Sequence, residues 1–381
     1  MITITATDTL TFKENRRLGI INFGEDNLYP NHTQTMSDNS GALKRCIQTK
    51  EKFIFGNGVT ENNGFWKSVI NPAGLRVDQL TRLITRQYSM HDGFAVHIGY
   101  NALLEKVALQ VIPFENLRLP WPDDEGNITE IWYHSNWSCR RIEQKDIKVY
   151  NMYTTDKEVI MRQIETAGGF DKWGGHIMYF GEVGRIMYPH NSFHAVLEDV
   201  ITDIKLKKGR NANVSTNFMP SAIIEFPFLF KNISPYPEDR KENSTTTLFK
   251  DEIMAALEKY QGNENLGKLM ALENPSVDKD GKHIPFNIRK LDIQNFDKLF
   301  ESTESAVKAA IRGIYNQPEI LHDTVATGFS TEIMNDMYRY YNSITSDDRQ
   351  IIEETMMELF SGWYYDINPT KNYSLKPLTF A

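Results

Sequence analysis

The spacing of apolar residues in the first half of the chain predicts two helices and then a set of short strands. Residues 39–55 carry apolar residues at helical spacing, with Lys50 on the same face, and Gly56 stands where this helix would end. A second helical pattern covers residues 77–90. Apolar runs bounded by turn residues then predict strands at residues 94–100, 107–112, 128–134, 148–153 and 176–180. We expect a mixed, mostly antiparallel sheet in an α+β domain.

Two long helices are predicted further along the chain. Asn191 or Ser192 can cap the first, whose apolar residues keep i, i+3, i+4, i+7 spacing until Gly209. The second covers residues 296–315 and ends before Pro318. They would be about 24 Å and about 30 Å long. Because each has a continuous apolar face and the sequence between them is compact, we expect the two helices to pack antiparallel.

The sequence between the long helices predicts a small α/β module at residues 214–290. It contains an apolar strand at residues 222–226, a loop rich in proline and charge at residues 235–244, a helix from Phe249 and a second strand at residues 268–272. We expect these strands to pair within or between subunits.

The C-terminal part of the chain predicts a long helix or a kinked pair of helices over residues 330–361. Ser330 is suited to cap it, and the polar run from Ser346 to Asp348 would interrupt it. An apolar, strand-like tail follows at residues 373–380.

Residues 260–273 contain a glycine and lysine spacing that is typical of a phosphate-binding loop. Gly262, Gly267 and Lys268 match it, but Leu269 stands where Mg²⁺ coordination needs a Ser or Thr hydroxyl. The predicted order is helix, loop, strand, whereas phosphate binding needs a helix N-terminus after the loop. We therefore expect no nucleotide here, and a nucleotide-dependent enzyme is the alternative hypothesis.

Four motifs follow one another along the chain. They are FGEDNLYPN at Phe23–Asn31, IFGNGV at Ile54–Val59, a G-N-x-N-x-G-K turn ahead of a long helix that ends in Ile314–Leu321, and GFSTEIMNDMYRYYNSIT at Gly328–Thr345. In their order and spacing, these motifs resemble portal proteins of tailed double-stranded DNA bacteriophages, over residues 20 to 365.

The resemblance implies an α+β, portal-like architecture with an α/β wing, a two-helix stem and a small α/β clip. It divides the chain into the N-terminal wing (1–190), the first stem helix (191–213), the clip (214–291), the second stem helix (292–316), the tunnel-loop region (317–330) and the completion of the wing (331–381). Because few residues follow the last predicted helix, we expect the helical crown of larger relatives to be reduced or absent.

The resemblance also implies a function. Portal proteins form a ring, usually a dodecamer, at one capsid vertex, through which DNA is packaged and ejected. The implied partners are double-stranded DNA, the large terminase, a head-completion or adaptor protein and the major capsid protein. The implied location is the virion, with assembly in the host cytoplasm. Another virion connector protein is a further alternative, and a closed ring with an axial hole distinguishes the portal from it.

Composition limits the classes of partner. The net charge of −8 argues against a protein that holds nucleic acid through a broad basic face, although it suits a surface past which DNA must move. No run is apolar and long enough to span a bilayer, and the N-terminus lacks the pattern of a secretion signal, so we expect a soluble chain with no membrane partner. Cys46 and Cys139 are expected to be reduced, packed thiols.

A basic cluster lies near the end of the first long helix and consists of Lys205, Lys207, Lys208 and Arg210. Two interpretations stay open. These cations can complement the helix macrodipole, since acidic residues stand at the start of the same helix. Alternatively, ring symmetry would repeat them at the junction of stem and clip, where they would contact DNA phosphates or adaptor proteins.

The connection after the second long helix is the second candidate region. The resemblance implies a tunnel loop that projects toward DNA, and its candidate residues are His322, Asp323, Thr324, Val325, Thr327 and Gly328. An ordinary helix connection is the other interpretation.

No catalytic, metal-binding or cofactor-binding site is expected. His190 and His194 are four residues apart, but no glutamate stands in a metalloprotease position and no third ligand is apparent, so a structural role is favoured. The sequence also lacks a G-x-S-x-G elbow, a C-x-x-C pair and a G-x-G-x-x-G after a strand.

Overall fold

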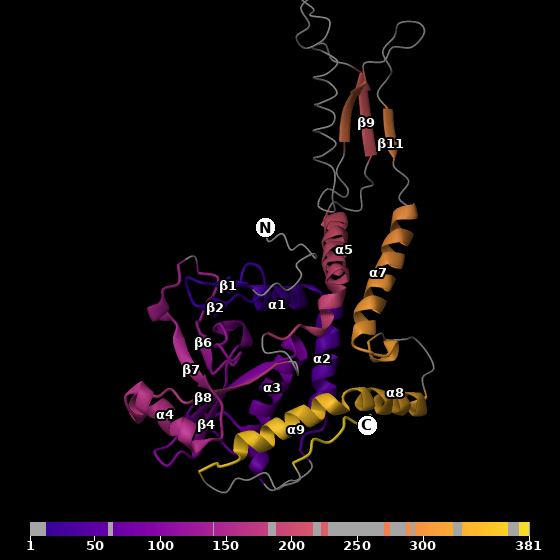
Figure 1. Cartoon of the computed structure of the whole chain (residues 1–381). Coiled ribbons are helices and arrows are strands. Elements are labelled where there is room, and N and C mark those ends of the chain that lie inside the picture. Colours follow the sequence, from indigo (N-terminus) through magenta and orange to yellow (C-terminus); the bar gives the residue numbers. More distant parts are fainter. Residues whose placement is uncertain are drawn as a thin grey trace, which may run out of the picture. The chain divides into compact units, whose positions relative to one another are not determined.

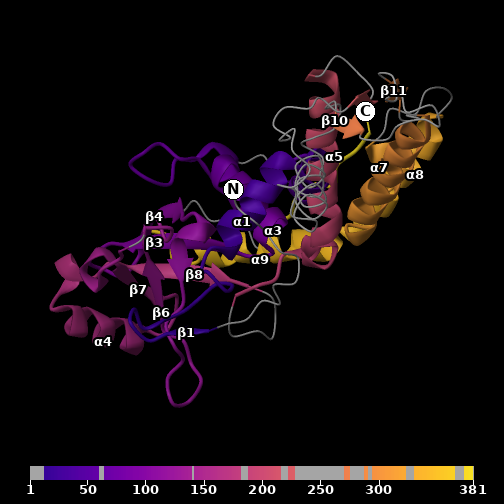
Figure 2. The ribbon, with the colours of Figure 1, turned by 90° about the horizontal axis from the view of Figure 1, so that it is seen from above.

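A computed structural model gives the fold as two compact units, one formed by Met1–Val200 with Ala309–Ala381 and the other by Ile201–Lys308. It describes residues 13–59, 64–139, 141–181, 188–215, 222–227, 270–274, 287–290, 294–322, 330–364 and 373–380. The first unit contains a six-stranded sheet and most of the helices (Figures 1 and 2).

The sheet of the first unit has the strand order β4-β3-β8-β7-β6-β5. Its neighbouring strands are antiparallel, except for the parallel pair β7–β8. The strands are β3 (Phe94–Tyr100), β4 (Lys106–Val111), β5 (Leu117–Arg118), β6 (Glu130–Tyr133), β7 (Lys148–Met152) and β8 (His176–Phe180). The mixed, mostly antiparallel sheet and its five predicted strands are therefore confirmed, and β5 was not predicted.

The central strand β3 is buried on both faces because alternate residues enter different cores. Phe94, Val96 and Ile98 belong to one apolar cluster, and Ala95 belongs to another. The first cluster includes apolar side chains of the helices α2 (Gly41–Phe55), α3 (Val77–His91) and α9 (Ser346–Phe360). The second is built from sheet residues together with Phe23 and Tyr188, whose rings stack at 4.0 Å.

The helices α2 and α3 begin and end as their sequences predict. The Ser40 hydroxyl accepts a hydrogen bond from Leu43 N at 3.2 Å, which caps the start of α2. Gly56 follows the last turn with φ of 58°, and a Cβ there would lie 1.9 Å from the carbonyl oxygen of Lys376. Glycine is therefore required at position 56.

Several short elements of the first unit were not predicted. They are β1 (Glu14–Asn15), β2 (Ile20–Ile21), α1 (Tyr29–Asn39) and α4 (Lys157–Ala167). In the helix α4, Ile160 is the one residue that is buried.

The C-terminal helices form the kinked pair that the sequence allowed. The helix α8 (Thr331–Ile344) begins after Ser330, whose hydroxyl accepts from Ile333 N at 3.3 Å, and Thr345 separates it from α9. The tail at residues 373–380 is not a regular strand, since it makes one isolated bridge, from Leu375 to Val59. Its aromatic end contacts α8, with Phe380 and Tyr338 ring centroids 5.6 Å apart.

The second unit contains parts of two long helices and a three-stranded sheet. The elements are α5 (Leu197–Ser215), β9 (Ala222–Pro227), β10 (Met270–Asn274), β11 (Asn287–Lys290) and α7 (Gln294–Ile314). In the sheet, β9 pairs in parallel with β10 and antiparallel with β11. Within this unit, α5 and α7 lie side by side and run in opposite directions (Figures 1 and 2).

Two expectations for the second unit need correction. The first long helix does not end at Gly209, because α5 continues to Ser215, and its first predicted turn is a 3-10 helix at Ser192–Val196. The second strand begins at Met270 and not at residue 268. The predicted loop at 235–244, the helix from Phe249 and the loop at 262–268 lie outside the described residues.

Candidate DNA- and partner-facing site

The four cations of the basic cluster do not share one face of α5. Successive residues of an α-helix are rotated by 100°, so Arg210 lies on a different side of the helix from Lys208. The Arg210 guanidinium reaches α7 and lies 3.0 Å from the Glu304 carboxylate. Lys205, Lys207 and Lys208 are exposed. All four cations are therefore exposed, and Arg210 also forms an ion pair with α7.

Glu304 pairs with two cations, Arg210 on the neighbouring helix α5 and Lys308 on its own helix α7. Its side chain is 20% exposed, and its oxygens lie 3.0 Å from Arg210 and 2.8 Å from Lys308, one turn further along α7. Sequence reasoning did not single out Glu304. The i, i+4 spacing of Glu304 and Lys308 was the available signal for this pair.

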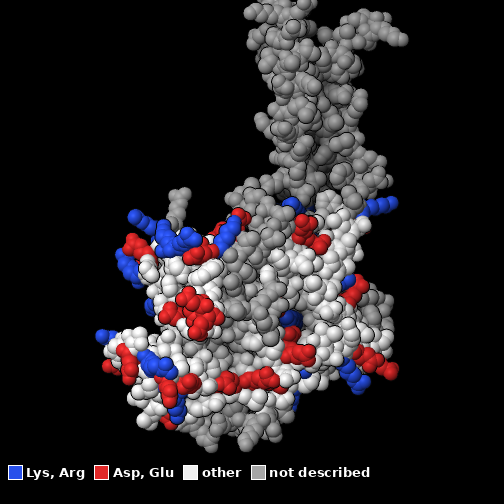
Figure 3. Space-filling model, in the orientation of Figure 1, with Lys and Arg blue, Asp and Glu red and all other residues white. Residues whose placement is uncertain are grey.

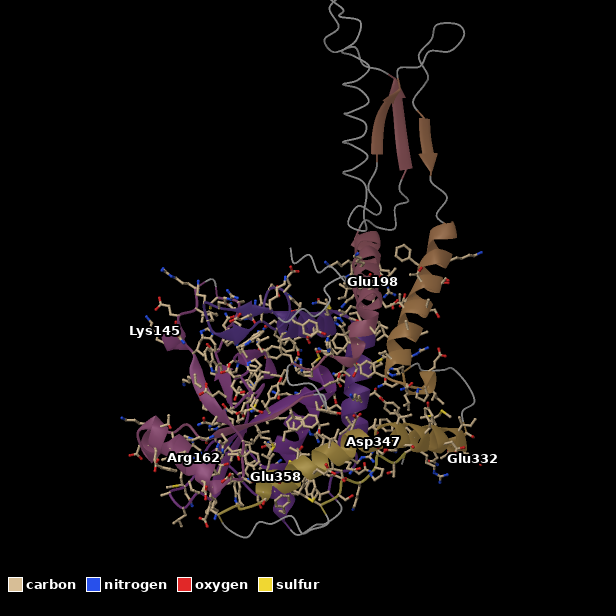
Figure 4. All side chains as sticks on the ribbon, viewed as in Figure 1. Lys145, Arg162, Glu198, Glu332, Asp347 and Glu358 are labelled. Carbon is tan, nitrogen blue, oxygen red and sulfur yellow. The ribbon has the colours of Figure 1, made fainter. Side chains whose placement is uncertain are left out.

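The three lysines remain compatible with both interpretations of the cluster. Glu198 and Asp199 lie in the first turn of α5, and Figure 4 labels Glu198 there. This is the charge order that complements a helix dipole. On the face drawn in Figure 3, the described acidic and basic side chains are interspersed. The expectation that the lysines face a channel stays a prediction.

Of the six tunnel-loop candidates, only His322 lies within the described residues, and residues 323–329 lie outside them. His322 is fixed to neighbouring elements by both its side chain and its backbone. Its Nε2 is hydrogen-bonded to Gln317 Oε1, and its carbonyl oxygen accepts from the Arg45 guanidinium. The start of this connection is therefore held against α2.

Gln317 is the buried residue that organises this attachment. Its amide nitrogen donates to the Cys46 carbonyl oxygen at 2.8 Å and to the Tyr341 hydroxyl at 2.6 Å. Asn316, with φ of 50°, turns the chain after α7 so that Gln317 points into the interior. The motif Asn316-Gln317-Pro318 thus joins the end of α7 to α2 and α8. Sequence reasoning used it for the family resemblance and did not predict these contacts.

A buried ion cluster positions the chain just before α5. Lys50 Nζ lies 3.0 Å from the Asp92 carboxylate and 3.8 Å from the Asp348 carboxylate. Burial alone would lower the pKa of Lys50, but the two carboxylates together raise it above its ordinary value, so this lysine is charged. Tyr88 donates to Asp348 at 2.8 Å. A lysine on the apolar face of a predicted helix was the sequence signal for such a cluster.

Asp92 corrects the predicted cap of the first long helix. The Asn191 side chain donates to the Met90 carbonyl oxygen at 2.9 Å and does not cap the helix. Instead, the Asp92 carboxylate accepts from the backbone N–H and, at 2.6 Å, from the hydroxyl of Ser192. A cap that comes from another element cannot be found by inspecting neighbouring positions in the sequence.

The ion cluster lines a cavity of about 770 Å³ together with His190 and His194. His194 Nδ1 is hydrogen-bonded to the Tyr29 hydroxyl at 3.0 Å, and burial lowers the pKa of this histidine. Within the described ranges, no three His, Cys, Asp or Glu side chains are grouped to hold a metal ion. The hydrogen bond to Tyr29 agrees with the structural role expected for His194.

The two cysteines differ in their burial. Cys46 is buried, and burial raises the pKa of its thiol to about 12, whereas Cys139 is exposed and the expectation of a packed thiol is wrong there. None of the described helices is both long and apolar enough to cross a bilayer.

The fold is shared with chains of solved particles. A chain in the virion of a native gene transfer agent particle is 12% identical, with a TM-score of 0.51 over 88% of this chain and 81% of that one. A chain in the neck of an empty gene transfer agent particle, computed with C6 symmetry, is 12% identical, with a TM-score of 0.50 over 92% and 85%. These likenesses confirm the fold class that the sequence predicted.

A further likeness is weaker. A phage portal protein of the HK97 family from Corynebacterium diphtheriae is 9% identical, with a TM-score of 0.36 over 80% of this chain and 82% of that one, and carries no weight of its own. No family model and no curated protein sequence matches the chain.

Proposed function

We propose that this chain is the subunit of a portal-type ring in a virion, through which double-stranded DNA is packaged and ejected. The observation that carries the proposal is the fold shared with the virion and neck chains of gene transfer agent particles over most of both chains. The neck was computed with C6 symmetry, which implies a closed assembly. A ring requires a heterologous, head-to-tail contact that closes.

In this proposal the chain divides into a wing, a stem, a clip and a tunnel loop. The wing consists of residues 1–190 and 331–381, and the stem consists of residues 191–213 and 292–316. The clip is residues 214–291, and the tunnel loop lies in residues 317–330. The two long helices joined by the Arg210–Glu304 ion pair support the stem assignment. The attachment of His322 to Gln317 and Arg45 supports a connection that starts from a fixed point.

The proposed ring does no chemistry of its own. Leu269 after Lys268 leaves the phosphate-loop spacing without its Mg²⁺ ligand, so the energy for packaging comes from a separate terminase motor. The other proposed partners are an adaptor or head-completion protein and the major capsid protein. The proposed place is one vertex of the virion, with assembly in the host cytoplasm.

Electron microscopy of the purified chain tests this function. We expect closed rings with an axial hole, and the rotational symmetry of the particle images shows directly whether the rings are closed. A stable monomer or an icosahedral shell would contradict the portal. A separate nucleotide-binding measurement addresses the enzyme alternative, since ATP binding that is lost in Lys268→Ala would favour it.

A further inference from the structure

The helix α8 carries two apolar stripes, and among the described residues of the first unit only one of them is covered. Tyr338 and Tyr341 pack against Phe53 of α2, with ring centroids 5.0 Å and 4.8 Å apart. The second stripe has the spacing i, i+4, i+7, i+11 and consists of Ile333, Met337, Tyr340 and Ile344. This is the spacing of a helix face that packs against another element. We call these four residues the α8 ridge.

The α8 ridge is exposed to an extent that is unusual for apolar side chains in a row. Ile333, Tyr340 and Ile344 are 43%, 48% and 41% exposed. Met337 and Tyr340 also line a cavity of about 430 Å³ with Gly313 and residues 316–318 at the end of α7. A continuous apolar ridge beside a hollow is typical of an interaction surface.

The charges beside the α8 ridge limit the class of partner. Glu332 and Asp336 lie along one edge of the ridge, and Arg339 lies 3.7 Å from Asp336. Acidic edges repel phosphate, so DNA does not fit this surface. A membrane-surface helix would carry several lysines and arginines along its polar face, whereas Arg339 is the one cation of α8. The surface therefore suits a protein whose own apolar surface has basic edges.

The same chain carries such a surface between the C-terminal end of α2 and the middle of α3. A groove of about 180 Å³ is lined by Glu51, Lys52, Phe55, Gly56, Arg82 and Leu378. The Arg82 guanidinium lies over the Phe55 ring at 4.4 Å, and Leu83 beside it is 38% exposed. Arg86 is a further base at this edge and lies 3.5 Å from Glu51. We call this surface the α2–α3 groove.

The α8 ridge and the α2–α3 groove are complementary in charge and both are apolar at their centres. They are also two different surfaces of one chain, so a contact between them across two copies is heterologous. We propose that the α8 ridge of one copy packs against the α2–α3 groove of a second copy. This inference rests on the proposed ring and names the surfaces that close it.

A photoreactive benzophenone amino acid in place of Tyr340 tests the contact in assembled rings. We expect ultraviolet light to produce dimers of the chain, in which the cross-linked peptide of the second copy includes the region of Lys52–Gly56 or Arg82–Arg86. The matched probe replaces Arg339, whose side chain is 84% exposed on the neighbouring side of the same helix, and should give several-fold less product.

The outcomes separate this inference from the proposed function. Rings in which the Tyr340 probe reaches DNA, a different protein, another part of the second copy or nothing would overturn the inference and leave the ring in place. A chain that forms no ring would overturn both.

A pair of substitutions gives a second test. Ile344→Asp should reduce the ring fraction at least tenfold, because it buries a charge in the contact. Ser343→Asp adds the same charge one position away from the ridge and should leave the fraction unchanged. Circular dichroism of the monomers controls for folding, and equal ring fractions for both variants would contradict the contact.

Discussion

His91 shows how a single buried residue makes stability depend on pH. It is 4% exposed and stacks on Phe114 at 5.3 Å, and burial lowers the pKa of its imidazole from 6.5 to about 4. The folded chain therefore binds fewer protons than the unfolded chain between these values. The stability of the folded chain that depends on a neutral His91 is therefore fully present above pH 6.5 and is lost as the pH falls toward 4.

We expect His91→Gln to remove this part of the pH dependence. At pH 4.5 the wild-type chain should lose about 2 to 3 kcal/mol more stability, relative to pH 7, than the variant does. Denaturant unfolding of both proteins at the two pH values measures the difference. Parallel pH profiles would show that the imidazole titrates normally in the folded chain.

Helices and strands were predictable where one face of the element carries a strong apolar pattern. The helix α3 begins at Val77 as its periodicity predicts, and β3 carries a nearly continuous apolar run because both of its faces enter cores. The end of α5 was wrong because glycine costs a helix only about 1 kcal/mol, and Gly209 stands among lysines and an arginine that favour helix. Element boundaries therefore depend on neighbours that a single position does not reveal.

The ion pair between α5 and α7 should be measurable as a coupling between helices. Arg210→Gln and Glu304→Gln, alone and together, form a double-mutant cycle. Because the Arg210 side chain is 56% exposed, we expect a coupling energy of only about 0.5 to 1 kcal/mol. Lys308→Gln is the control within α7 and should give about 0.3 to 0.5 kcal/mol with Glu304→Gln. Additive effects of Arg210→Gln and Glu304→Gln would mean that this pair does not join the helices.

On the scale of the whole molecule, the order of motifs predicted the fold class better than any local pattern did. The contacts that hold the candidate site together join residues that are distant in sequence, such as Gln317 with Cys46 and Asp92 with Ser192. Such contacts are set by tertiary packing and leave no mark at neighbouring positions. The residues were visible in the sequence, but their partners were not.

Replacing the lysines of α5 tests whether the proposed ring contacts DNA through them. The triple replacement of Lys205, Lys207 and Lys208 by Gln removes three exposed cations and leaves the Arg210–Glu304 ion pair in place. Repeated around a ring, these cations would act collectively, because walls of low dielectric concentrate the potential in a channel. We expect ring assembly to be retained, since exposed charges contribute little to stability, and DNA retention or packaging to fall in a salt-sensitive way.

An in vitro packaging assay over a range of salt concentrations measures this effect. The control replaces three exposed lysines of the first unit, Lys145, Lys148 and Lys157, by Gln and changes the net charge equally. If both triple variants package and retain DNA like the wild type at every salt concentration, the α5 lysines only complement the helix dipole. If only the α5 variant is impaired, and the impairment depends on salt, the effect comes from the position of the charges and not from their number. A fixed, repeated electrostatic surface would produce that result, whereas a general loss of solubility would affect both variants.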